Sequence, residues 1–161
     1  MSAFADLLHS KGITDEDDIE WLHLLVEDWQ MIADLAFSDL VLWVKEGDTF
    51  TVVAHCRPNT GSTVYPHDEI GTVANDAERS LISDAMESAQ TRQYGSDEGL
   101  LQGAEAVPVV RDGSVIAVLT IHSDVERKAN YSRMERNYRS AGVMLLSMIA
   151  EGYFPDVEAP S

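Results

Sequence analysis

Two pairs of apolar segments, each joined by a tight-turn signal, constrain the fold of this chain more than any other feature. Residues 39–45 and 50–56 are rich in Val, Leu, Trp and Thr and flank a Glu-Gly-Asp turn sequence. Residues 105–111 and 114–122 flank an Asp-Gly pair, one of the stronger short hairpin signals. Both pairs therefore predict β-hairpins. Because these strands are close to continuously apolar, they predict a sheet that is covered on both faces.

Three other segments carry apolar residues at the three-and-four spacing of an amphipathic helix. They cover about residues 14–36, residues 76–90, and a final stretch that begins near Ser123 or Asn130 and runs to Glu151. Gly152 is expected to end the last helix. The apolar stripe predicted for the last helix comprises Met134, Tyr138, Ala141, Leu145, Met148 and Ile149.

The order of these segments is helix, hairpin, loop and helix, hairpin, helix, which predicts an α+β fold. We expect a central antiparallel sheet of about five or six strands, with the N- and C-terminal helices on one face and the middle helix plus loops on the other. Charge favours packing of the two chain ends, because the first 48 residues hold twelve acids against Lys11 and Lys45 and the final helix region is basic. Exposed ion pairs contribute only about 0–1 kcal/mol each.

Composition excludes several classes of partner. The 11 Lys and Arg against 28 Asp and Glu give a net charge of −17 at pH 7, so phosphate backbones and anionic membrane surfaces repel the chain. We therefore expect no direct binding of nucleic acid or membranes. A single cysteine, Cys56, excludes a disulfide framework within one chain. With no secretory signal recognisable in the first residues, this composition indicates one cytoplasmic domain.

Motifs of several enzyme classes are missing from the sequence. It contains no phosphate-binding loop ending in Gly-Lys-Ser/Thr, no Gly-x-Ser-x-Gly elbow, no His-Glu-x-x-His motif and no dinucleotide-binding fingerprint. His67 and His122 have acidic neighbours in the sequence, but adjacency in sequence does not make a catalytic triad. We therefore expect no catalytic residue in this chain.

The polar passage directly after the strand 50–56 carries the most informative ligand-binding pattern. It belongs to a loop over residues 57–75, and loops of this length in compact domains are usually functional. Arg57, Asn59 and Thr60 supply a guanidinium, an amide and a hydroxyl that suit a small anionic or polar ligand. The alternative is a tight turn in which Arg57 pairs with a nearby acid. Four more side chains could line the same cavity: Tyr65, His67, Tyr94 and His122.

Cys56 has two interpretations, and His55 belongs to the second. Free cysteines are commonly buried as small hydrophobic residues, which is the first interpretation. In the second, Arg57 and His55 lower the pKa of the thiol, which then oxidises or binds a soft metal. Strand alternation predicts that Cys56 shares a face with Val52 and Ala54, and that His55 points to the opposite face.

Six blocks of the sequence, in order and at similar spacing, resemble a known family. They are Leu25–Asp39, Leu42–Val44, Val53–Gly61, Gly71–Val73, Val115–Thr120 and Ala150–Asp156. These blocks are similar to the N-terminal GAF domain of actinobacterial sensor histidine kinases of the PdtaS type. The resemblance covers nearly the whole chain and implies a GAF-like, PAS-related fold, in agreement with the α+β arrangement predicted above.

The resemblance also implies a role in signalling. Residues 1–152 would be a GAF sensor domain, and residues 153–161 a linker towards PAS and kinase regions that this sequence lacks. The whole protein would autophosphorylate on His with ATP and Mg²⁺ and pass the phosphoryl group to a response regulator. GAF domains bind cyclic nucleotides, tetrapyrroles, haem or other small molecules, and this sequence does not identify which. We expect a homodimeric signal-input domain; the alternatives are a ligand-free dimerisation module and a redox or metal sensor centred on Cys56.

Overall fold

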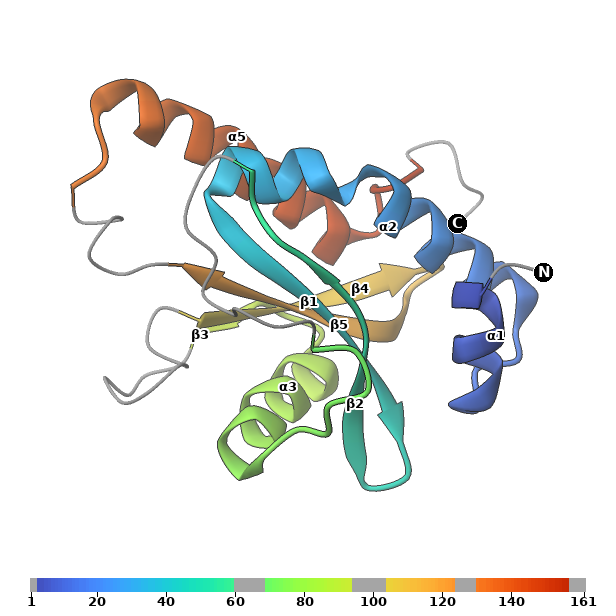
Figure 1. The fold of residues 1–161 in the computed structure, drawn as a ribbon. Helices are drawn as coiled ribbons and strands as arrows, with labels where there is room; N and C mark the ends of the chain where they lie inside the picture. Colours follow the sequence, from blue (N-terminus) through green and yellow to red (C-terminus); the bar gives the residue numbers. More distant parts are fainter. Residues whose placement is uncertain (1–2, 60–68, 94–103, 124–129, 157–161) are drawn as a thin grey trace.

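The computed structural model describes residues 3–59, 69–93, 104–123 and 130–156 (Figure 1). Every helix and hairpin strand predicted from the sequence is present, and two short elements, α1 and β3, were not predicted. The described elements are α1 (Ala3–Ser10), α2 (Glu16–Ala36), β1 (Ser38–Glu46), β2 (Thr49–Cys56), α3 (Asp76–Ser88), β3 (Arg92–Gln93), β4 (Ala104–Arg111), β5 (Ser114–Ser123) and α5 (Arg133–Glu151).

The strands form one five-stranded sheet in the order β2-β1-β5-β4-β3, and all neighbours are antiparallel. Each predicted hairpin is a neighbouring pair, and β1 and β5 join the two hairpins through pairs such as Asp39 with His122 and Val41 with Thr120. The predicted central antiparallel sheet is therefore confirmed. Its second hairpin turns at Asp112, in the left-handed region with φ of 51°, and Gly113, with φ of 78°.

Helices cover both faces of the sheet, as predicted (Figure 1). The helices α2 and α5 lie side by side over one face, and α3 lies over the other. Buried residues accordingly form two clusters: a larger one with Leu22, Leu25 and Ile149 on the α2/α5 face, and a smaller one with Leu81 and Ile82 on the α3 face. The sheet therefore separates two apolar cores.

Local signals in the sequence set the helix ends. Asp15 caps α2, where its side chain accepts hydrogen bonds from the backbone N–H groups of Asp17 and Asp18. The final helix begins after Ser132, which forms a capping box with Glu135, so it starts later than either predicted position. At the other end of α2, Phe37 adopts the left-handed conformation with φ of 52° and is the single residue between α2 and β1.

A glycine allows α2 and α5 to approach closely. A Cβ atom placed on Gly142 would lie 3.1 Å from the backbone nitrogen of Ala36 and 3.3 Å from Cβ of Leu35. Nearby, Nη1 of Arg139 donates a hydrogen bond to the Ala36 carbonyl over 3.2 Å. The predicted packing of the N- and C-terminal helices is therefore confirmed. At this contact the basic side chain of Arg139 meets the carbonyl end of α2, where the helix dipole favours positive charge.

The apolar stripe predicted for α5 is wrong in part. Gly142, Leu146 and Ile149 are buried, whereas Met134 and Tyr138 are 63% and 49% exposed. The helix carries apolar residues on more than one side, and the close approach at the glycine decides which side meets α2 and the sheet. An apolar strip of α5 is therefore left on the surface.

A β-bulge in β2 changes which residues share a face. Leu42 pairs with Ala54 but Trp43 pairs with Val52, so Val53 is an extra residue in the strand. Val53, Ala54 and Cys56 all pack on the α2/α5 face, while Val52 packs on the α3 face. The predicted grouping of Cys56 with Val52 is thus wrong, because simple alternation fails across the bulge.

Candidate functional site

Buried polar side chains gather at one end of the sheet, on the face that α3 covers. Asp39 lies near the start of β1, His55 near the end of β2, and Thr120 and His122 near the end of β5. Strand pairing brings them together, because Asp39 lies opposite His122 while Val41 lies opposite both His55 and Thr120. With Trp43, these residues form what we call the polar cluster. Buried polar groups are costly, so their gathering on one face calls for an explanation.

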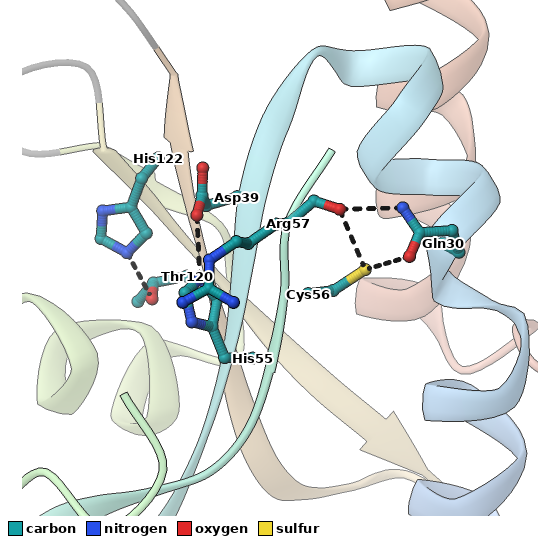
Figure 2. A network of polar contacts seen from close by, with 7 residues as sticks. All are labelled: Gln30, Asp39, His55, Cys56, Arg57, Thr120 and His122. Carbon is teal, nitrogen blue, oxygen red and sulfur yellow. Dashed lines mark hydrogen bonds and ion pairs between the residues drawn. The ribbon is translucent and has the colours of Figure 1, made fainter. Parts of the chain in front are cut away.

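Hydrogen bonds link the members of the polar cluster, and Figure 2 shows those among Asp39, His55, Thr120 and His122. Nε2 of His55 lies 2.8 Å from Oδ2 of Asp39, and these two side chains are 1% and 0% exposed. Nε1 of Trp43 donates to Oγ1 of Thr120 over 2.7 Å, and Nε2 of His122 lies 2.9 Å from the same oxygen. The cluster therefore contains a buried acid–base pair and, beside it, a tryptophan–threonine–histidine chain.

The helix α3 packs over the tryptophan–threonine–histidine part of the polar cluster. The space between them, lined by Trp43, Glu78, Leu81, Ile82, Thr120 and His122, is too small to admit a water molecule. Burial raises the pKa of Glu78, although its hydrogen bond with the Asn75 backbone acts in the opposite direction. A ligand that contacts His122 from this side must therefore displace part of α3.

The structure places the predicted ligand-binding residues in different settings. His122 is 1% exposed and belongs to the polar cluster, whereas Arg57 and Asn59 are exposed just beyond β2. The side chain of Arg57 extends toward the side of the sheet that carries Asp39 and His55, and its carbonyl faces Gln30 on the other side (Figure 2). The remaining predicted residues lie outside the described part of the chain: Thr60, Tyr65, His67 and Tyr94.

Sequence reasoning missed Asp39 and Thr120. A signal for both was present: the acid Asp39 directly precedes a run of apolar strand residues, and Thr120 and His122 alternate with apolar residues near the end of β5. Two polar residues at alternate strand positions share one face of the sheet. That alternation in the sequence is sufficient to place Thr120 next to His122.

The environment of Cys56 opposes a reactive thiol. Burial first, and then the charges of Asp34 and Asp39, raise the pKa of the thiol to about 12. Sγ donates to Oε1 of Gln30 over 3.3 Å, while His55 lies on the opposite face in its pair with Asp39. The pKa lowering expected from Arg57 and His55 is therefore wrong. Within the part of the chain that the structure describes, no group of three or more His, Cys, Asp or Glu residues could hold a metal ion.

Comparisons with known proteins define the class of this domain. Its structure is similar to that of a sensor region of a sensor histidine kinase, with a TM-score of 0.81, 34% identity, and coverage of 100% of this chain and 57% of that chain. A putative IclR-type transcriptional regulator from Silicibacter shares the fold at 12% identity, with a TM-score of 0.53 and coverage of 90% of this chain and 70% of the other. The fold is thus that of a sensory domain.

The family follows from sequence. The model of the GAF domain of histidine kinase PdtaS matches residues 4–142, and the chain belongs to that family. It is 36% identical to the sensor histidine kinase PdtaS of Mycolicibacterium smegmatis, over 98% of this chain, and 35% identical to that of Mycobacterium tuberculosis, over 97%. In both comparisons it spans 33% of the relative's length. The chain is therefore a sensory GAF domain of the histidine-kinase type. No helix in the described residues is long and apolar enough to cross a membrane.

Proposed function

We propose that this domain binds a small polar ligand over the α3 face of its sheet and passes the resulting change of conformation to a kinase region. The relatives that it matches are sensor histidine kinases three times its length. The whole protein would then autophosphorylate on His with ATP and Mg²⁺ in the cytoplasm, and transfer the phosphoryl group to a response regulator.

The polar cluster is the observation that carries this proposal. The exposed guanidinium of Arg57 extends toward the same side of the sheet as the buried His55 and His122, so one ligand can meet a cation and imidazole donors (Figure 2). Since the space under α3 is filled, entry of a ligand there requires α3 to move. Binding and conformational change are thereby linked, as a sensor requires.

Calorimetric titration tests the ligand proposal. The panel consists of cyclic mononucleotides, cyclic dinucleotides, haem and divalent cations, each titrated into the wild-type chain. We expect one class to bind, and expect Thr120→Val, which removes a hydroxyl at nearly constant volume, to weaken that binding. Asp84→Asn, on the exposed side of α3, serves as the matched control. Absence of binding across the panel, or equal effects of both substitutions, would contradict the proposal.

A second candidate function is a dimerisation module that needs no ligand. It is supported by the filled space under α3 and by large apolar side chains on the surface of α5. The exposed fractions are 63% for Met134, 49% for Tyr138, 43% for Val143 and 67% for Met144. The helix also contributes arginines to an otherwise acidic chain, so two copies meet with least repulsion along α5.

Sedimentation velocity tests the dimer interface on α5. If α5 forms a dimer interface, Met144→Glu is expected to convert the dimer to a monomer. Val73→Glu introduces the same charge at a position that is 55% exposed and away from α5, and it should leave the dimer intact. A wild-type chain that sediments as a monomer at all concentrations would contradict dimerisation through this helix.

A further inference from the structure

Two side chains of α2, one helical turn apart, hold the segment that follows β2. Nε2 of Gln30 donates to the Arg57 carbonyl over 2.8 Å (Figure 2). The same nitrogen donates to Oδ1 of Asp34 over 3.1 Å. The same Asp34 oxygen accepts from the backbone N–H of Asn59 over 2.7 Å. Oε1 of Gln30 accepts from the Cys56 thiol over 3.3 Å. We call these two residues the Gln30–Asp34 clamp.

We propose that the Gln30–Asp34 clamp couples the position of residues 57–59 to that of α2, so that Gln30 and Asp34 act as positioning residues of the sensor. This inference rests on the proposed function, in which Arg57 contributes to the ligand site. The clamp holds the backbone of Arg57 from the α2 side, while the side chain of Arg57 extends to the other side of the sheet. One residue therefore takes part in both the ligand site and the contact with the helix layer.

The position of β2 makes this coupling effective. In the described sheet β2 is an edge strand with β1 as its neighbour, so its end is supported by a strand on one side. The clamp supplies support from α2, and it includes a bond from a backbone N–H to a charged carboxylate, which is stronger than a bond between neutral groups. A displacement of residues 57–59 must therefore either break these bonds or move α2.

The last turn of α2 continues the coupling to α5. Asp34 of the clamp is followed by Leu35 and Ala36, the two residues that Gly142 of α5 approaches most closely. Arg139 of α5 also holds the Ala36 carbonyl. A shift of this turn is therefore transmitted to α5 by direct contact, and by reciprocity a shift imposed from α5 reaches residues 57–59.

Amide hydrogen exchange measured by NMR on the 161-residue chain tests the clamp itself. Removing the acceptor with Asp34→Ala is expected to speed exchange of the Asn59 amide at least about tenfold, because a hydrogen bond to a charged group is lost. Asp34→Asn keeps an oxygen acceptor and should retain most of the protection. Asp28→Ala, on the same helix and exposed, should change nothing at Asn59. Equal exchange in Asp34→Ala and wild type would overturn the clamp.

A second pair of variants tests the coupling. Gly142→Ala places a methyl group against Ala36 and is expected to change the exchange rate of the Asn59 amide severalfold in the otherwise wild-type chain. With the clamp removed by Gln30→Leu and Asp34→Ala together, the same substitution should leave that rate unchanged. An unchanged rate in the intact chain, or an equal change with and without the clamp, would refute the coupling.

These exchange measurements need neither ligand nor kinase, so the two proposals can fail separately. If the exchange rates of the Asn59 amide respond as expected but no compound of the panel binds, the clamp is retained and the ligand proposal is rejected. If a ligand binds but Gly142→Ala does not change the exchange rate of the Asn59 amide, the ligand site is retained and the clamp is rejected as its connection to α5.

Discussion

The two faces of the sheet are built from different kinds of residue. On the α2/α5 face the larger apolar cluster, which includes the thiol of Cys56, lies under two long helices. On the α3 face a smaller apolar cluster lies next to the polar cluster, under a helix of 13 residues. Burial of apolar area is the main favourable term in folding. The α2/α5 face therefore supplies most of the stability, and the α3 face can hold functional polar residues.

The buried polar residues of the α3 face need not add to the stability of the fold. A buried polar pair such as Asp39 with His55 is often no more stabilising than apolar residues of similar volume. Its retention on the face with the smaller apolar cluster agrees with a role in recognition.

The largest expected effect concerns the reactivity of Cys56. With the pKa raised from 9.0 to about 12, the thiolate fraction at pH 8 is lower than that of an ordinary thiol by about a thousandfold. Alkylation of the folded chain by iodoacetamide should be slower than that of the urea-unfolded chain by a similar factor. Similar rates in the two states would show that the α2/α5 face exposes its thiol.

The same shift gives a pH dependence of stability. The folded state holds the Cys56 proton more tightly than the unfolded state. The stability that the folded state gains from this proton is therefore complete below pH 9 and is lost as the pH rises toward 12. Urea denaturation of wild type should show a steeper loss of stability over this range than Cys56→Ser, which lacks the titrating thiol. Parallel curves for the two proteins would contradict the shift.

Breaking the Asp39–His55 pair should have the next largest effect. Asp39→Ala leaves His55 without this partner in the buried polar cluster and is expected to cost about 3–5 kcal/mol of unfolding free energy. Replacing both residues by Leu should cost less than the single change, because neither polar partner then remains buried. Chemical denaturation measures both variants. A double variant less stable than Asp39→Ala would mean that the pair itself stabilises the α3 face.

A bulky residue at the helix contact should be less damaging. Gly142→Val forces atoms against Ala36 and Leu35 and is expected to cost about 1–3 kcal/mol by overpacking. Ala141→Val, at the exposed neighbouring position, tests helix propensity alone and should cost about 0.5 kcal/mol. Equal costs measured by urea denaturation would show that α2 and α5 separate easily.

The smallest expected effect is at the carboxyl end of α2. Arg139→Ala removes the donor to the Ala36 carbonyl and should cost about 0.3–1 kcal/mol, less at high salt because the interaction is screened. Arg133→Ala, in the exposed first turn of α5, is the matched control and should be close to neutral. An effect of Arg139→Ala that does not depend on salt would contradict the electrostatic origin.

Most of the fold could be predicted from the sequence because its signals are local. The turns of the two hairpins, the periodicity of α2 and the glycine after α5 each act within a few residues. The β-bulge at Val53 and the choice of buried side on α5 could not be predicted in this way, since both depend on packing between distant segments. The same limit applies to part of the candidate site. His122 was identified, and its partner Thr120 lies two residues away on the same strand, whereas Asp39 becomes a neighbour of His122 only through strand register.

The junction between α2 and β1 has a mechanical consequence. With Phe37 as the single residue between them, helix and strand share a stiff joint with no spare length of chain. Any rotation of α2 about its own axis must therefore twist the start of β1, where Ser38 is buried against Ser123 and Asp39 against His55. A torque applied to the helix layer from outside thus reaches the interior of the domain within two residues.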